Sequence, residues 1–195
     1  MAKCCWLPWL IIILLPLPPC DGSSGADVDP TAGFAAVELT GDMFKLHKPY
    51  DLPPEQRYEF RDGVRRMWVL CSDRPFSPGS TTKPRSEILL NVFGASGRNT
   101  TLMLHVYGGR LMYYHDEARV VDGDIYDRWF RLNVVHDVAG VGKLAVFVDG
   151  ERRLAVPGHG GYRHYFKFVV YVQRDPSHYM ESRWRDVKVY TKIVD

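Results

Sequence analysis

The chain is poor in cysteine, and the few cysteines it has gather at one end. It has four among 195 residues, and three of them fall within the first twenty. Cys71 is the remaining one, so no internal disulfide framework can form in the rest of the chain. Cys71 ends an apolar alternation that runs through Met67 and Val69. We therefore expect it to be a small buried hydrophobe rather than a reactive thiol.

Blocks of like charge and the short motifs of several enzyme classes are also absent. The 25 basic and 23 acidic residues are interspersed and give a net charge of +2, which makes nucleic acid a poor candidate partner. The sequence has no His-Glu-x-x-His, no Cys-x-x-Cys, no phosphate-binding glycine loop and no Gly-x-Ser-x-Gly turn. His159 and His164 are the closest histidine pair, but they flank glycines, and loop histidines are more often solvated than ligating. We predict no metal site and no cofactor.

No apolar run is long enough to span a bilayer, although the N-terminus is strongly apolar. Lys3 precedes the run 6–15, and prolines and the small polar stretch 21–26 follow it, which is the order of a secretory signal peptide. The run is shorter than the roughly 20 residues of a membrane span, so a retained anchor is the weaker interpretation. We expect residues 1–26 to be a leader cleaved between 20 and 26, and 27–195 to be one domain. Asn99 begins an Asn-Thr-Thr sequence that fits the glycosylation acceptor pattern.

In the remaining chain, turn residues separate short segments that have the pattern of β-strands. Two hairpins are predicted, one with arms 57–60 and 64–71 around Asp62-Gly63, the other with arms 143–148 and 151–156 around Asp149-Gly150. Further strands are expected at 101–107, 110–115, 129–136, 165–173 and 184–190, with a weaker one at 42–46 and a helical turn at 53–57. In the second hairpin, Leu144, Val146 and Val148 should face inward. This pattern predicts an all-β fold, an antiparallel sandwich of the jelly-roll or lectin-like kind.

The strand predicted at 165–173 divides into two unlike faces, because successive side chains of a strand point to opposite sides. Phe166, Phe168, Val170 and Val172 form an apolar row suited to a core. Tyr165, Lys167, Tyr171 and Gln173 share the other face. A cation, two phenols and an amide suit the binding of an acidic or hydroxylated ligand. The alternative is a half-exposed strand whose tyrosines and lysine merely face water.

This strand and the segment 83–94 together resemble the alginate lyase family of jelly-roll polysaccharide lyases. Arg85 and Glu87 match an Arg-Ser/Thr-Glu signature, and the strand at 165–173 matches a Tyr-Phe-Lys-Ala-Gly-x-Tyr-x-Gln signature. The similarity covers residues 29–191. Within that superfamily the chain is most similar to plant vacuolar citrate-binding proteins, through the segments 29–34, 48–53, 92–96, 100–104, 126–134, 165–167 and 180–184. The resemblance implies a secreted or vacuolar jelly roll, in the vacuole or the apoplast, that binds a small polycarboxylate.

The chain departs from the lyase pattern at three positions. The resemblance implies that arginine and glutamine neutralise the uronate carboxylate, while a histidine and the second tyrosine of the last signature handle protons. Phe93 stands where the histidine is expected, Asn91 where the glutamine is, and Val169 where a glycine is. Phenylalanine cannot accept a proton, so only a route with Tyr171 as both acid and base, assisted by Arg85, would remain.

The same resemblance implies that a segment is missing. Relatives carry a few tens of residues between Glu87 and Val92, whereas here the two run together without a turn signal. If this stretch is one continuous strand, Arg85 and Asn91 share a face but lie about 20 Å apart, too far to hold one carboxylate. We expect either a shortened isoform or gene model with a damaged sandwich, or a local rearrangement that exposes an edge strand.

Three functions remain open. We favour non-catalytic binding of citrate or a similar polycarboxylate or acidic carbohydrate by a chain that is a monomer without stable membrane insertion. The predicted ligand-binding residues are Arg85, Glu87, Asn91, Tyr165, Lys167, Tyr171 and Gln173. The alternatives are a lyase that cleaves polyuronates by β-elimination and a cell-wall carbohydrate-binding module.

Overall fold

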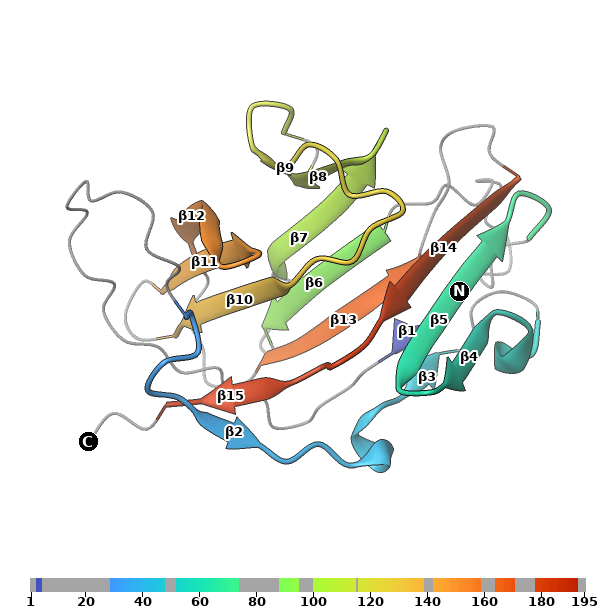
Figure 1. Cartoon of the computed structure of the whole chain (residues 1–195), viewed down its shortest axis with the longest axis horizontal. Coiled ribbons are helices and arrows are strands. Elements are labelled where there is room, and N and C mark those ends of the chain that lie inside the picture. The colour runs from blue at the N-terminus through green and yellow to red at the C-terminus, as the bar shows by residue number, and fades with distance from the viewer. Residues whose placement is uncertain are drawn as a thin grey trace.

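The computed structural model describes residues 3–4, 29–47, 52–73, 88–94, 100–114, 116–138, 142–158, 164–170 and 178–192 (Figure 1). Strands dominate these residues. They are β1 (Lys3–Cys4), β2 (Ala35–Val37), β3 (Leu46–His47), β4 (Tyr58–Arg61), β5 (Val64–Leu70), β6 (Ile88–Gly94), β7 (Thr100–Tyr107), β8 (Arg110–Tyr113), β9 (Val120–Asp122), β10 (Leu132–Asp137), β11 (Lys143–Val148), β12 (Glu151–Pro157), β13 (His164–Val170), β14 (Tyr179–Trp184) and β15 (Val189–Thr191). The helices are two 3₁₀ turns, η1 (Gly41–Met43) and η2 (Pro54–Gln56), and no described helix could cross a membrane.

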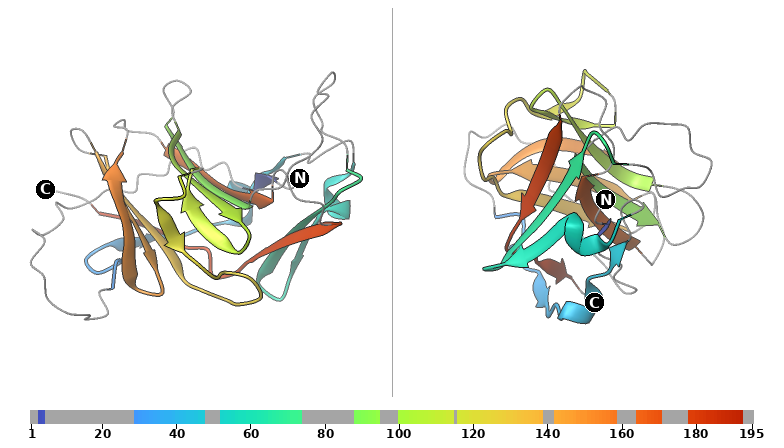
Figure 2. Two further views of the ribbon diagram at one scale, coloured as in Figure 1. Left: turned by 90° about the horizontal axis from the view of Figure 1, so that it is seen from above. Right: turned by 90° about the vertical axis from the view of Figure 1, so that its right-hand side faces the viewer.

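The strands form one large sheet and three small ones, all antiparallel. The large sheet has seven strands in the order β3-β1-β13-β6-β7-β8-β9. The small sheets are β10-β11-β12, β14-β5-β4 and β15-β2. Figures 1 and 2 show β10–β12 and β14-β5-β4 as two separate groups on one side of the large sheet. The predicted all-β antiparallel sandwich of the jelly-roll class is thereby confirmed.

Both predicted hairpins are present, and their turns explain their register. Asp62 and Gly63 have φ values of 50° and 76°, and Asp149 and Gly150 have 52° and 90°. Two successive residues with positive φ are typical of a type I′ turn, whose twist matches that of the flanking strands. The inward residues predicted for β11 are buried, but so are Ala145 and Phe147 between them, so both faces of this strand are covered. The turn predicted at 53–57 is η2.

Several strand predictions were wrong in their bounds. In the segment 42–46, the first two residues belong to the turn η1 and only Leu46 to a strand. The strand predicted at 129–136 begins only at Leu132, and the one predicted at 110–115 ends at Tyr113. The strand expected at 184–190 is two strands, since β14 ends at Trp184 and β15 begins at Val189. Asp186 between them has a φ of 51°, a left-handed conformation that interrupts extended backbone.

Cys71 is exposed, which corrects the expectation that it is buried. β5 ends at Leu70, and the chain turns there, with the Asp73 N–H donating to the Leu70 carbonyl at 3.0 Å. The apolar alternation of β5 therefore stops one residue before Cys71. Its Sγ lies 3.3 Å from Nδ1 of His178.

The buried side chains form two hydrophobic clusters rather than one. The first holds Met67, Val69, Phe168, Val170 and Val189. The second holds Val92, Leu102, Leu104, Val106, Leu111, Val121, Ile125, Leu144, Val146, Val148, Leu154 and Val156. Phe166 is half-buried and packs against both. A single domain usually has one contiguous hydrophobic core. The division into two clusters therefore shows where packing between the sheets is interrupted.

Candidate functional site

The predicted ligand-binding strand is β13, and its pairing with β6 brings two of the predicted residues to the same level of the sheet. Lys167 lies opposite Asn91, and Tyr165 lies opposite Phe93. Directly opposite residues of an antiparallel pair point to the same side, so these positions share one face of the sheet, called here the polar face. Tyr165 and Lys167 are half-buried there. Phe93, which the sequence resemblance predicts at the position of the lyase histidine, therefore has its backbone position on this face.

The polar face extends onto β7, where sequence analysis missed a histidine. Asn91 lies opposite Met103, and His105 is the next β7 residue on the same face. His105 is 2% exposed, and its Nδ1 lies 3.0 Å from the hydroxyl oxygen of Tyr107. The alternation of apolar and other residues in 101–107 could have revealed this placement, because Leu102 and Leu104 lie on the opposite, core-facing side.

Most of the other predicted site residues belong to parts of the chain outside the described ranges. Arg85, Glu87, Tyr171, Gln173 and the acceptor Asn99 lie outside the described residues, as does Val172. For Asn91 and Val169 the structure gives the strand position but not the side chain. The strand predicted across 85–94 is described from Ile88 to Gly94. Its continuation toward Arg85 stays a prediction.

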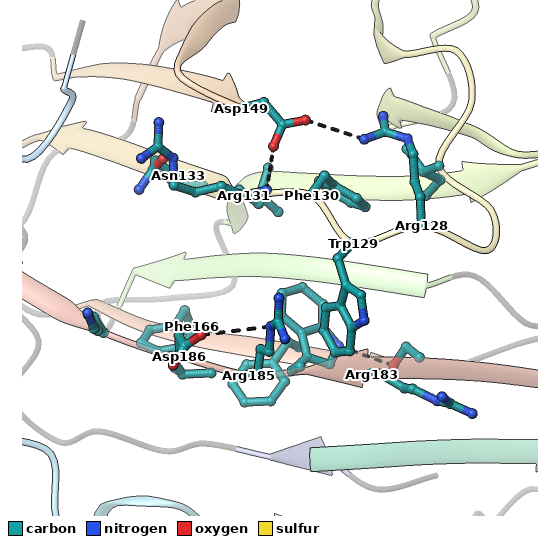
Figure 3. Close-up of a pocket in the computed structure, with 18 of the residues that line it drawn as sticks. Arg128, Trp129, Phe130, Arg131, Asn133, Asp149, Phe166, Arg183, Arg185 and Asp186 are labelled. Atoms are coloured by element: carbon teal, nitrogen blue, oxygen red, sulfur yellow. Dashed lines mark hydrogen bonds and ion pairs between the residues drawn. The ribbon is translucent and has the colours of Figure 1, made fainter. Parts of the chain in front are cut away.

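A large hollow lies on the opposite side of β13. It measures about 1500 Å³, and Phe166 and Phe168 of β13 and Val92 of β6 form part of its lining. Figure 3 shows Phe166 among the lining side chains. Tyr165 and Lys167 do not line it. The interior hollow, as we call it, is therefore a space between the sheets and not the predicted ligand cleft.

One rim of the interior hollow is fixed by charged side chains around Arg128. Its guanidinium binds the Asp122 carboxylate, and its Nη1 lies 3.3 Å from Oδ2 of Asp149. Oδ1 of Asp149 accepts a 2.7 Å hydrogen bond from the Arg131 N–H. Burial by itself would raise the pKa of Asp122, but the Asp124 N–H and Arg128 hold that pKa below its ordinary value. These contacts tie the segment before β10 to the β11–β12 turn.

The opposite rim is formed by β14 and carries its own ion pairs. Glu181 accepts a 2.7 Å hydrogen bond from Nε of Arg66 and also binds Arg183 and Tyr179. The hydrogen bond to Glu181 raises the pKa of Arg66. Across the mouth, the Arg185 guanidinium lies 4.5 Å from the centre of the Trp129 ring (Figure 3). That cation–π contact links the segment before β10 to the segment after β14.

His164 is buried rather than solvated, which corrects the expectation of a loop histidine. It is the first residue of β13, is 3% exposed, and its ring centre lies 4.4 Å from that of His136. Burial lowers the pKa of His164. His159 lies outside the described residues. Within the part of the chain that the structure describes, no group of three His, Cys, Asp or Glu side chains could hold a metal ion.

Comparison with known proteins gives three similarities. The family model described as "Alginate lyase" matches residues 88–191. The citrate-binding protein of Hevea brasiliensis is 41% identical over 191 residues, covering 83% of this chain and 79% of that protein. A solved alginate lyase from polysaccharide lyase family 7 has a TM-score of 0.49 and 13% identity, covering 83% of this chain and 93% of the other.

The alignment with the Hevea protein also includes positions that no residue of this chain fills. It is 191 positions long, whereas 83% of this 195-residue chain is about 162 residues. About 29 positions of the alignment therefore have no residue of this chain. This agrees in size with the segment of a few tens of residues predicted to be missing between Glu87 and Val92.

Proposed function

The chain belongs to the alginate lyase family whose model matches residues 88–191, and from that premise we propose that it binds citrate or a similar small polycarboxylate without catalysis. The polar face is the proposed site. The observation that supports it best is the register of β13 against β6, in which Lys167 lies opposite the Asn91 position and Tyr165 is the next residue of β13 on the same face. A relative at 41% identity is named a citrate-binding protein.

The chemistry of these groups suits a polycarboxylate. An ammonium offers three hydrogen-bond donors with a positive charge, an amide offers two donors, and a phenol offers one. Hydrogen bonds from a charged donor to a carboxylate are the strong ones. Same-face positions along β13 are about 6.6 Å apart, and cross-strand neighbours are about 5 Å apart, so carboxylates on adjacent carbons can reach separate donors. Arg85, Tyr171 and Gln173 stay predicted members of this site.

Phe93 is the reason to propose binding rather than catalysis. β-Elimination needs a group that removes a proton from the sugar carbon, and phenylalanine cannot do so. The backbone register opposite Tyr165 puts this apolar ring position on the polar face itself.

Isothermal titration with citrate tests the proposal. Lys167→Met removes the charge and keeps the stem, and loss of a hydrogen bond to a charged group should weaken binding roughly 10- to 100-fold. Lys143→Met is the matched control, since Lys143 is an exposed lysine at the start of β11 in another sheet. Binding should also weaken with salt. Equal citrate affinity for the wild type and the Lys167 variant would dismiss the site.

A polyuronate lyase is the second candidate, and the family match is what favours it. It predicts a rise in ultraviolet absorbance from unsaturated sugar products on alginate or glucuronan, lost in Tyr171→Phe. No rise with either polymer excludes it. A carbohydrate-binding module with neither citrate affinity nor activity would give signals on a glycan array alone.

A further inference from the structure

The interior hollow separates two sheets that each end in an open strand. Among the described residues, β10 pairs with β11 alone and β14 pairs with β5 alone. The residues 132–135 of β10 and 179–184 of β14 both line the hollow. The backbone N–H and C=O groups on these two edges therefore point toward the same space from opposite rims.

On both rims, the apolar side chains face the hydrophobic clusters. Leu132 and Val134 of β10 pack against the second cluster, and Met180 and Trp184 of β14 pack against the first, yet all four are only half-buried. The intervening β14 residues Glu181 and Arg183 form the ion pairs of the outer surface. A chain segment between the rims would thus have an apolar inner face and a polar outer face, as one β-strand has.

The strand directions allow one strand to fill the space. In Figure 1, β10 and β14 both run toward the left of the view. A wholly antiparallel sheet can join two strands of like direction only through an odd number of strands, and one is the smallest. One added strand would give the continuous order β12-β11-β10-new-β14-β5-β4. That sheet would have seven strands, like the sheet it faces.

The interior hollow leaves apolar side chains incompletely packed and one polar atom without a hydrogen bond. Phe166 and Phe168 form its floor, and among the described residues Phe166 is the one that packs against both hydrophobic clusters, while staying half-buried. Oδ1 of Asn133, on β10, is buried and has no hydrogen-bond partner within the described ranges. A strand seated here would join the two clusters into one core and offer backbone donors to this rim.

We propose that the interior hollow is an acceptor groove for one β-strand, and that its occupant is the segment which the Hevea relative has and this chain lacks, supplied by another molecule. About 29 unmatched positions in that alignment are more than enough for a strand that spans the six residues of β10 and of β14. By the resemblance given above, the missing segment lies between Glu87 and Val92, and Val92 of β6, which begins at Ile88, is part of the lining of the hollow. Peptide capture by strand addition uses backbone hydrogen bonds for affinity and alternate side chains for specificity.

Titration of the purified chain with a synthetic peptide tests this proposal. The peptide carries the Hevea protein's sequence across the unmatched positions with a fluorescent label, and a scrambled peptide of the same composition is the control. We expect saturable binding with one peptide per chain and a rise in melting temperature of roughly 5–10 °C at a peptide concentration 100 times the Kd. N-methylation of alternate backbone amides of the peptide should reduce affinity more than tenfold, because it removes donors to the rims while leaving the protein intact.

A protein variant checks the location. Val134→Asp places a charge on the inner side of β10 and should abolish peptide binding, whereas Val120→Asp, at a 38% exposed position of β9, should not. Equal binding of the scrambled or N-methylated peptides would overturn the proposal. So would a dimer that the peptide does not dissociate, since a second copy would then fill the groove. None of these readouts involves citrate.

Discussion

Replacement of Asp73 by asparagine measures how strongly one buried ion pair holds the β4–β5 hairpin. Arg57 immediately precedes β4, and Asp73 follows β5, so their contact closes the open end of the hairpin. Nε of Arg57 donates to Oδ2 of Asp73 at 2.7 Å, and its second nitrogen binds Oδ1 of the same carboxylate. The Leu70 N–H also donates to Oδ2, at 2.8 Å.

The magnitude follows from burial. The side chains of Arg57 and Asp73 are 12% and 3% exposed, so solvent cannot replace a lost partner. Breaking such a pair on one side costs about 3–5 kcal/mol, because the other charge stays buried. Asparagine keeps one acceptor oxygen, so we expect the lower limit, about 3 kcal/mol, or a melting temperature roughly 6–12 °C lower.

Chemical denaturation followed by tryptophan fluorescence gives the free energy of unfolding. Glu151→Gln is the matched control, since its pair with Arg153 is 2.8 Å long but 66% and 43% exposed, and an exposed pair contributes less than about 1 kcal/mol. A double-mutant cycle with Arg57→Gln should give a coupling above about 2 kcal/mol. The reasoning is refuted if Asp73→Asn costs no more than the control, or if the coupling is near zero.

Three further predictions concern stability. Burial lowers the pKa of His164, so the unfolded chain binds a proton more readily than the folded one. The free energy of unfolding should therefore fall as pH drops below about 6.5. His164→Phe should flatten this pH dependence in denaturant titrations between pH 5 and 8. Gly142→Ala should cost about 1–3 kcal/mol, since its φ is +69° and a Cβ would lie 2.9 Å from a backbone oxygen, whereas Gly123→Ala, with open space, should be nearly neutral in the same melts. Asp149→Ala should lose about 1–2 kcal/mol, because a positive φ and the 2.7 Å bond from Arg131 both favour Asp, and Asp149→Asn should retain most of the stability in calorimetry.

Local patterns in the sequence were enough to predict much of the fold. The two Asp-Gly hairpins, η2 and the apolar row of Phe168 and Val170 follow from turn chemistry and the two-residue period of strands, which act over a few residues. The ends of strands were predicted wrongly where one residue changes the direction of the backbone. Cys71 lies in the turn that follows β5, and Asp186 interrupts what alternation alone suggests is one strand.

The candidate site depends on pairings that a single strand does not encode. Period-two alternation predicts that Tyr165 and Lys167 share a face, but only the register shows that Asn91 lies opposite Lys167. His105 was missed because its strand was interpreted for its core residues alone. The ring of His164 packs at a tilt against that of His136, which is 28 residues away in the sequence, a contact that single-strand patterns do not predict. The interior hollow likewise arises from segments far apart in the chain.

The two hydrophobic clusters meet along the boundary between β13 and β6. Phe168 and Val170 of β13 belong to the first cluster and Val92 of β6 to the second, while the two strands pair along their whole length from His164–Gly94 to Val170–Ile88. Cooperativity between the two halves is therefore transmitted by a ladder of main-chain hydrogen bonds more than by interlocking side chains. Amides in this ladder should exchange with solvent deuterium only when the two halves separate. Their protection factors therefore measure the free energy of that separation and show whether the two halves unfold together.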